Sequence, residues 1–336
     1  IDDAESVIWA PRYSEVGDFE IYAAADCNLL ELLQPDRYVV RNDSAMVGII
    51  ERVKLEVDAE DGDHVTVSGR CAKSILSRRI VWGLGVFTGT VEDCIRKAIA
   101  DNATAPSMAQ RAIPGLLLGE RLGLADTLDV QVTGKNLMDT IISWCKAYSY
   151  GWEVVLGADR KFLVRLFVGE DRSDAQSVNP RVTFSPAFDN LLASNYEYDV
   201  TDAVNAVLVA GEGEGINRKM VGVGSASGIS RRENFVDARN ASSKVGDAGL
   251  TPVEYAALLT EQGRAHIAEN TVAATFDGEI DHATVFTLGE HYFLGDIVNV
   301  INEYGVAGTA RITEIVECED AEGHTVTPTF EEWRLV

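Results

Sequence analysis

The sequence predicts a mixed α+β fold in which β-strands dominate. Most of the chain consists of short runs that alternate apolar and polar residues and end at glycine or acidic turns, as strands do. Two of these stretches, 36–69 and 295–330, follow the same order of strands and turns. Longer segments with apolar residues at helical spacing lie between them. We therefore expect two related β modules near the chain ends and smaller helix-containing parts between them.

The two stretches agree at each landmark. Each has a β-branched and aromatic run, a polar turn, an alternating strand, an acidic turn with a glycine, and a Val-Thr pair. The corresponding segments are 38–40 and 297–301, 49–53 and 311–315, and 58–63 and 317–323. Short β-meanders also resemble one another by chance, so chance remains the alternative, but the agreement favours an internal duplication.

Before the first stretch, residues 9–22 (WAPRYSEVGDFEIY) predict two strands around a turn at 15–18, because acidic residues and glycine favour turns. The following CNLLELLQPDRY predicts a short helical segment. Asn28 is the expected start of this segment, and Pro35 is the expected stop.

Three amphipathic helices are expected after the first stretch. Thr90 and Asp93 form a capping box at the start of TVEDCIRKAIADN, and KNLMDTIISWCKAYSY predicts a second helix. A hairpin turning at 157–159 follows. Thr251 and Glu254 cap the third helix, TPVEYAALLTEQGRAHIAEN, with proline at its first position.

These elements divide the chain into four expected parts. The first β module covers 1–85, and an α+β insert covers 86–180. The second β module combines 181–215 with 281–336, and it surrounds a small helix-containing insert at 216–280.

The composition is strongly acidic. Asp and Glu number 53 against 29 Lys and Arg, which gives a formal charge of −24. Such a surface repels phosphate backbones, so the sequence predicts no specific nucleic-acid binding. The acidic excess either confers solubility or serves a particular surface.

No cofactor, metal or catalytic site is predicted. The glycines of VAGEGEG do not have the dinucleotide-binding spacing, and no helix pattern follows them at once. His64 and His324 occupy corresponding places beside the acidic turns, where we expect turn residues, with a metal site as the alternative. Carboxylates are so abundant that their presence alone identifies no acid–base pair.

The five cysteines are odd in number and lack C-x-x-C spacing, so neither a disulfide framework nor a zinc site is predicted. Cys94 and Cys145 fall on apolar helix faces, where we expect small buried side chains. No apolar run approaches the ~20 residues that a membrane-spanning helix needs. We therefore expect no membrane partner and synthesis in a reducing cytoplasm.

Taken in order, the modules resemble the tail hub proteins at the tip of the tail tube of tailed bacteriophages, including siphophage and prophage tail proteins. The resemblance extends over essentially the whole chain. The strings that carry it are SVIWAPRYSEVGDFEIY, LLELLQPDRYVVRNDS, VTVSGRCAKSILSRRIV, TVEDCIRKAI, FDNLLASNYEYDVTDAVNAVLVAGEGEG and LGDIVNVINEYG with ARITEI. They are specific as a set and contain no catalytic signature.

The resemblance implies two related β-barrel-like tube domains with two smaller α/β domains between them. It also implies a homotrimeric ring that adapts a sixfold tail tube to a threefold tip and forms part of the DNA channel of the virion. The implied partners are the tail tube or distal tail protein and a tip or fibre protein. Because the family's first strand would precede Ile1, we expect the first barrel to be incomplete.

An acidic channel wall would let DNA slide, which gives the acidic excess a use. The acidic turns are therefore the expected channel-lining loops. Their residues are Asp58, Glu60, Asp61, Asp63, Glu317, Glu319, Asp320 and Glu322.

Two other functions stay open at this stage. A peptidoglycan-degrading tail enzyme would need a cleft with two carboxyl groups about 5 to 9.5 Å apart. A host-surface carbohydrate-binding module would need exposed aromatic side chains, and the five tryptophans are scattered, with Trp144 on a predicted core face.

Overall fold

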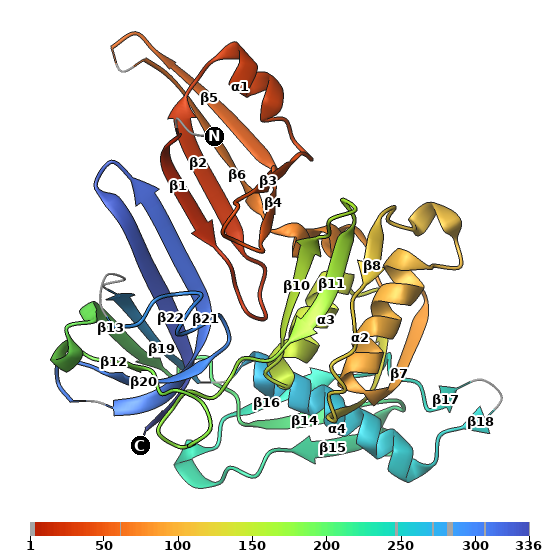
Figure 1. Ribbon diagram of the computed structural model, residues 1–336. Coiled ribbons are helices and arrows are strands. Elements are labelled where there is room, and N and C mark those ends of the chain that lie inside the picture. Colours follow the sequence, from red (N-terminus) through yellow and green to blue (C-terminus); the bar gives the residue numbers. More distant parts are fainter. Residues whose placement is uncertain are drawn as a thin grey trace. The chain divides into compact units, whose positions relative to one another are not determined.

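The computed structural model describes residues 4–60, 62–245, 248–270, 272–280, 285–305 and 307–335 (Figure 1). The chain forms two compact units. Unit 1 contains Ile1–Ser74, Gly151–Tyr198 and Ala274–Val336, and unit 2 contains Ile75–Tyr150 and Asp199–Ala273. Strands outnumber helices in the described part, so the predicted mixed α+β, β-rich class is confirmed.

The first β module of unit 1 is built around four neighbouring strands in the order β1-β2-β6-β5. A separate pair, β3 and β4, precedes β5 in the chain. The elements are β1 (Ala4–Ala10), β2 (Asp18–Ala24), α1 (Cys27–Leu32), β3 (Tyr38–Val40), β4 (Val47–Ile49), β5 (Arg52–Asp58) and β6 (Gly62–Arg70). Trp9, Phe19, Ile21, Val65 and Val67 form its buried core.

The N-cap of the short helix α1 lies two residues before the predicted start. Asp26 is its N-cap, and the Asp26 Oδ1 atom accepts hydrogen bonds from the backbone N–H groups of Asn28 (2.6 Å) and Leu29 (3.0 Å). The predicted start at Asn28 is therefore wrong. An aspartate placed just before the helix satisfies two N–H groups that have no partner inside the helix.

The second β module of unit 1 contains the strands β13-β19-β22-β21, with β20 and then β12 attached to β21. Its elements are β12 (Thr183–Phe184), β13 (Leu191–Asp199), β19 (Ala273–Ile280), β20 (Ile297–Ile301), β21 (Ala307–Asp320) and β22 (Gly323–Leu335). Its core is separate from that of the first module and includes Phe184, Tyr292, Val298, Ile312 and Phe330, all fully buried.

The same strand order occurs in both modules. β1, β2 and β6 follow one another in the sheet as β13, β19 and β22 do. In the second module one long strand, β21, corresponds to both β4 and β5 of the first module. β20 pairs with β21 as β3 pairs with β4. The two stretches that the sequence singled out thus fold into strands of the same order and antiparallel pairing.

The sheets of the described residues are not closed into barrels, which corrects the expected closed form. β1 pairs antiparallel with β21, so the strands form one open path from β13 to β5. Between β12 and β13 the buried Asn190 side chain makes two hydrogen bonds to the backbone. Its Nδ2 donates to the Thr183 carbonyl, and its Oδ1 accepts from the Ser185 N–H, each at 2.9 Å.

The predicted hairpin at 151–169 is confirmed and belongs to unit 1. β10 (Gly151–Leu156) pairs antiparallel with β11 (Phe162–Phe167), and the Gly157 N–H closes the turn on the Lys161 carbonyl at 2.8 Å. Trp152 is fully buried, and its indole Nε1–H donates to the Ser14 carbonyl at 2.7 Å. This bond ties the hairpin to the turn between β1 and β2.

A buried lysine holds that same turn. The Lys73 side chain is 4% exposed, and its Nζ donates to the carbonyls of Arg12 (2.6 Å), Tyr13 (3.1 Å) and Glu15 (2.7 Å). The ammonium also lies 5.1 Å from the centre of the Trp152 ring. A buried charge is tolerated only when its donors are satisfied, and here three carbonyls satisfy them.

In the described residues, unit 2 combines three α-helices with several small sheets. Its strands are β7 (Leu84–Thr90) with β9 (Thr127–Thr133), the set β15 (Met220–Val223), β14 (Ala206–Ala210) and β16 (Glu233–Asp237), and the short β8 (Leu116–Leu118), β17 (Lys244–Val245) and β18 (Ala248–Gly249). The helices are α2 (Val91–Ile99), α3 (Leu137–Ala147) and α4 (Pro252–Glu269), and α4 contacts both α3 and the sheet around β14.

The predicted helix starts are confirmed. The Thr90 hydroxyl accepts the Asp93 N–H at 3.1 Å. At α4 the Thr251 hydroxyl accepts the Glu254 N–H at 3.3 Å, and the Glu254 carboxylate accepts the Thr251 N–H at 2.7 Å. Cys94 and Cys145 are buried as expected, and desolvation raises the pKa of the Cys94 thiol to about 11.

Replacing Lys73 by methionine tests the role of the buried ammonium. The Lys73→Met variant keeps the apolar stem but leaves three buried carbonyls without their donor, so we expect the free energy of unfolding of unit 1 to fall by roughly 2 to 4 kcal/mol. Thermal unfolding followed by circular dichroism measures the change. Lys161→Met, at an exposed hairpin turn of the same unit, is the matched control and should leave the midpoint unchanged.

Candidate functional site: the acidic end of one sheet

The first acidic turn forms the tip of the β5–β6 hairpin. The last ladder pair joins Asp58 to Gly62, and the described acidic residues Asp58, Glu60 and Asp63 are all exposed. The Asp58 carboxylate accepts the Glu60 N–H at 2.7 Å, which shapes the turn. Asp61 lies outside the described residues.

The second acidic turn forms the tip of the β21–β22 hairpin. Asp320 pairs with Gly323, and the Asp320 carboxylate accepts the Glu322 N–H at 2.8 Å. Glu319, Asp320 and Glu322 are exposed. The two tips therefore share a local design, in which an aspartate at the strand end bonds to the backbone two residues later.

Glu317 differs from the other predicted residues of this turn because its side chain is only 13% exposed. Its Oε2 lies 3.1 Å from Nη2 of Arg41 and 3.5 Å from Nε2 of His324. Arg41 also holds Asp43 with two hydrogen bonds of 3.0 and 2.7 Å. Glu317 thus forms part of a packed ion pair between the two β modules of unit 1.

Both tips lie at the same end of the continuous sheet. The path from β21 through β1, β2 and β6 to β5 contains four antiparallel steps, so β21 and β5 run in the same direction. The register places Glu319 level with Val7 and, across the sheet, with Val53. Asp58 is five residues beyond Val53, about 17 Å farther along the strands. The fold therefore gathers the two turns at one end, at different heights.

Both histidines beside the turns contact neighbouring side chains. His64 stacks on Tyr22 with ring centres 4.9 Å apart, and its Nε2 lies 3.3 Å from the Glu5 carboxylate. His324 lies beside Glu317. Among the residues that the structure describes, no group of three or more His, Cys, Asp and Glu side chains could hold a metal ion.

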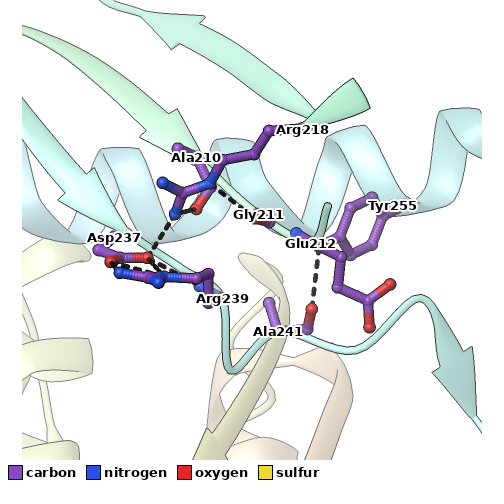
Figure 2. Close-up of polar contacts among 8 residues, drawn as sticks. All are labelled: Ala210, Gly211, Glu212, Arg218, Asp237, Arg239, Ala241 and Tyr255. Atoms are coloured by element: carbon purple, nitrogen blue, oxygen red, sulfur yellow. Dashed lines mark hydrogen bonds and ion pairs between the residues drawn. The ribbon is translucent and has the colours of Figure 1, made fainter. Parts of the chain in front are cut away.

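A second cluster of charges, which the sequence did not predict, lies in unit 2 where β14 and β16 end side by side (Figure 2). The Arg218 guanidinium donates to the carbonyls of Ala210 (2.9 Å) and Gly211 (3.0 Å) and to the Asp237 carboxylate. Arg239 donates to the same carboxylate at 2.9 Å. Hydrogen bonds from Arg239, and then from Arg218, hold the pKa of Asp237 well below its usual value.

Glu212 and Tyr255 occupy the other side of this cluster. Glu212 accepts the Ser243 N–H at 3.0 Å and the Ser243 hydroxyl, and the bond from the Ser243 side chain lowers the pKa of Glu212. The Tyr255 hydroxyl donates to the Ala241 carbonyl (2.9 Å) and accepts the Glu212 N–H (2.8 Å). The carboxylates of the cluster are thus bound as anions by fixed donors.

The glycine-rich run VAGEGEG has a packing role here. A Cβ atom on Gly211 would lie 2.3 Å from the Tyr255 hydroxyl, so only glycine allows the close approach of α4. Gly213 adopts a φ of 100°, which side chains rarely allow. The local geometry accounts for the glycines through backbone conformation and helix packing.

A cavity of about 470 Å³ borders this cluster and is lined in part by Glu212, Lys219, Ser243 and Tyr255. A second cavity of about 290 Å³ in unit 2 is lined in part by Asp139, Ser143, His266 and Glu269. The Ser143 hydroxyl is bonded to Glu269 at 2.5 Å. The catalytic acid of a glycosidase needs a raised pKa. Glu212, which borders the first cavity, and Asp237, which belongs to the Arg218 cluster, both have lowered pKa values.

The chain has the fold of solved phage and prophage tail proteins. It shares its fold with the tail protein of Neisseria meningitidis MC58, with a TM-score of 0.57 and 14% identity over 98% of this chain and 92% of that one. A 43 kDa tail protein of prophage MuSo2 from Shewanella oneidensis gives 0.56 and 11%, covering 98% and 94% of the two chains. Prophage tail protein gp18 from Listeria monocytogenes EGD-e gives 0.51 and 11%, covering 98% and 90%.

The chain belongs to the family of siphovirus ReqiPepy6 Gp37-like proteins, whose match extends over residues 1–330. The resemblance to phage tail proteins that the sequence indicated is therefore confirmed. No curated protein gives a significant match. The described helices include none with the length and apolar character that crossing a bilayer requires.

Replacing Asp237 by asparagine tests the charge cluster of unit 2. Because the folded-state pKa of Asp237 is lowered, its stabilising effect is present above the unfolded value of about 3.9 and is lost as the pH falls toward the folded value. We therefore expect Asp237→Asn to lower the melting temperature at pH 7, and the difference from the wild type to shrink near pH 3.

The control for this measurement is Asp202→Asn, a change at an exposed carboxylate of the same unit. It should leave both melting temperatures close to the wild-type values. An Asp237→Asn effect that stays constant between pH 7 and pH 3 would show that the carboxylate charge is not what stabilises the cluster.

Proposed function

We propose that this tail protein is a non-enzymatic hub subunit of the tail tip, and that three copies form a ring between the tail tube and the tip. The observation that carries the proposal is the strand order that occurs twice in unit 1. Two equivalent modules per chain give six in a trimer. Such a ring matches a sixfold tube on one side while keeping threefold symmetry on the other.

In this proposal the two β modules act as tube domains, and the parts at 86–180 and 216–280 are inserts. The ring contacts the tail tube or a distal tail protein on one side, and a tip or fibre protein on the other. The subunit is made in the bacterial host cytoplasm and resides in the virion. The fold that it shares with other tail proteins supports this assignment.

The acidic end of the sheet supports a DNA-conducting role. Both described tips carry only acidic residues and histidine among their charged groups, at one end of one sheet. Repeated in three copies, they would give a strongly negative rim, which repels DNA phosphates and prevents adhesion during passage. We infer that the tips border the channel.

A peptidoglycan-degrading enzyme and a carbohydrate-binding module remain the competing functions. An enzyme needs a carboxylic acid that is protonated near neutral pH, whereas Glu212 and Asp237 are held as anions. A sugar platform needs exposed rings, and of the tryptophans Trp9, Trp144 and Trp152 are buried while Trp82 is 58% exposed. The lowered pKa values of Glu212 and Asp237 favour the hub over the enzyme.

The oligomer provides the first test. At high protein concentration we expect a trimeric mass by light scattering or native mass spectrometry, and class averages by electron microscopy with threefold symmetry and six similar lobes. The hub would be contradicted if the purified protein is monomeric in solution and the same protein is also monomeric when imaged inside assembled tails. Turnover of purified peptidoglycan would favour the enzyme instead.

The position of the acidic tips provides a second, separate test. In a reconstruction of the ring at subnanometre resolution, we expect the β5–β6 and β21–β22 tips to border the central opening. Tips on the outer rim would contradict their role in the channel and leave the ring itself intact.

A further inference from the structure

An exposed tryptophan lies in unit 2, outside the Arg218 cluster. Trp82 is 58% exposed. In contrast, Trp9, Trp144 and Trp152 are at most 4% exposed. An indole in water leaves a large apolar surface uncovered, and its burial by another molecule is favourable. The exposure of Trp82 therefore marks this surface as a candidate contact site.

An arginine stacks over the Trp82 indole. The Cζ atom of Arg111 lies 4.8 Å from the centre of the ring, which is the range of a cation–π contact. The Arg111 Nη2 atom donates to the Ile80 carbonyl at 2.8 Å, and the Arg79 Nε atom donates to the Arg111 carbonyl at 2.6 Å. These bonds tie the turn Ala109–Arg111 to the segment that carries Trp82.

The backbone of Trp82 is held from the other side by a buried asparagine. The Trp82 N–H donates to Oδ1 of Asn102 at 2.9 Å, and Nδ2 of Asn102 donates to the Ala98 carbonyl at 2.9 Å. Asn102 lies in the π-helical turn Ala100–Thr104, which continues α2. Turns of this kind frequently occur at functional sites. A site held in this way loses little conformational freedom when a partner binds.

The two arginines carry charges that the described part of the chain does not neutralise with a carboxylate. Arg79 and Arg111 donate only to carbonyl groups, through two N–H groups of Arg79 and one of Arg111. A guanidinium has further N–H donors, whose geometry matches the two oxygens of a carboxylate. The chain as a whole has a formal charge of −24, so this surface differs in sign from the rest. It is complementary to an anionic partner.

Apolar side chains accompany these charges. Ile80 and Leu84, two residues before and after Trp82, are 40% and 49% exposed. Met108 is 39% exposed, and its carbonyl accepts the Arg111 N–H at 2.9 Å. Trp, Met and Arg are enriched in protein interfaces, and Trp and Arg are common among the residues that dominate binding. Nucleic acids and acidic sugars would leave the aliphatic side chains in water, so this composition favours a protein partner.

We propose that Trp82, Arg79 and Arg111 form a docking site for an acidic segment of another tail protein. Asp or Glu side chains of that segment bind the two guanidinium groups, and apolar side chains beside them cover the indole. The site lies entirely within unit 2. It is a further function of the chain, and it does not depend on the proposed ring or on the acidic tips.

Photo-cross-linking in assembled tails identifies the occupant. Leu84→p-benzoylphenylalanine places a cross-linker two residues from Trp82 and leaves the indole and both arginines intact. We expect irradiation of assembled tails to link this chain to a different tail protein, at a segment that contains Asp or Glu. Mass spectrometry of the linked peptide identifies that segment.

Removal of the two positive charges tests the electrostatic part of the site. Arg79→Gln and Arg111→Gln each keep a side-chain donor for the carbonyl that the arginine binds, but they remove the charge. We expect the double variant to lower the cross-link yield by about tenfold or more. Arg264→Gln is the matched control, since Arg264 belongs to the same unit and its side chain is 66% exposed. It should leave the yield unchanged.

A charge exchange separates docking from a structural effect. Arg111→Glu places a negative charge against the acidic segment and should abolish the cross-link. Lysine in place of the acidic residues of the linked segment should restore it, whereas damage to the fold would not be restored. Circular dichroism gives the melting temperature of each variant. If Arg111→Glu lowers that temperature, the glutamine variants decide the outcome.

Several results would overturn the docking site. A cross-link to a second copy of this chain, to DNA or to a segment without Asp and Glu would each do so. An unchanged yield in the double glutamine variant would show that the guanidinium charges do not bind the partner. Tails that contain the labelled chain but give no cross-link would show that nothing docks beside Trp82. None of these results bears on the hub, which the oligomer tests separately.

Discussion

The buried ammonium of Lys73 fixes the turn on which unit 1 depends. A lysine away from water must satisfy its three donors, and here the carbonyls of Arg12, Tyr13 and Glu15 do so. The turn is thereby held in one conformation. Tyr13 then packs against Gly295, where a Cβ atom would lie 2.4 Å from the ring, and the Tyr13 N–H bonds to the Thr313 carbonyl at 2.8 Å. The turn that Lys73 holds thus contacts the second β module through Tyr13.

The junction of β1 with β21 follows from this arrangement and gives the repeated modules a common sheet. Because each step across that sheet is antiparallel, the two acidic hairpins must point the same way. The duplication alone would not place them at one end, since two independent modules could face in any direction.

The second unit uses its charged groups for support. Arg218 and Arg239 both bind Asp237, and Arg218 also satisfies the carbonyls at the end of β14 (Figure 2). Such bidentate guanidinium contacts hold neighbouring strand ends and keep the carboxylate ionised. An ionised Asp237 cannot supply the protonated acid that glycoside hydrolysis needs.

Interactions between residues that are close in the sequence were sufficient to predict a large part of the secondary structure of this protein. Helical periodicity and capping residues such as Thr90 and Thr251 located the helices, alternation located the hairpins, and the repeated pattern of 36–69 and 295–330 located the two modules with a common strand order. These features depend on neighbours within a few residues. Only the tertiary structure decided that Asp26 caps α1, that Glu317 is packed against Arg41, and that the sheet is open with β1 on β21. Partners hundreds of residues apart meet through register and burial, and a pattern read along the chain contains no information about which distant strand will occupy an edge.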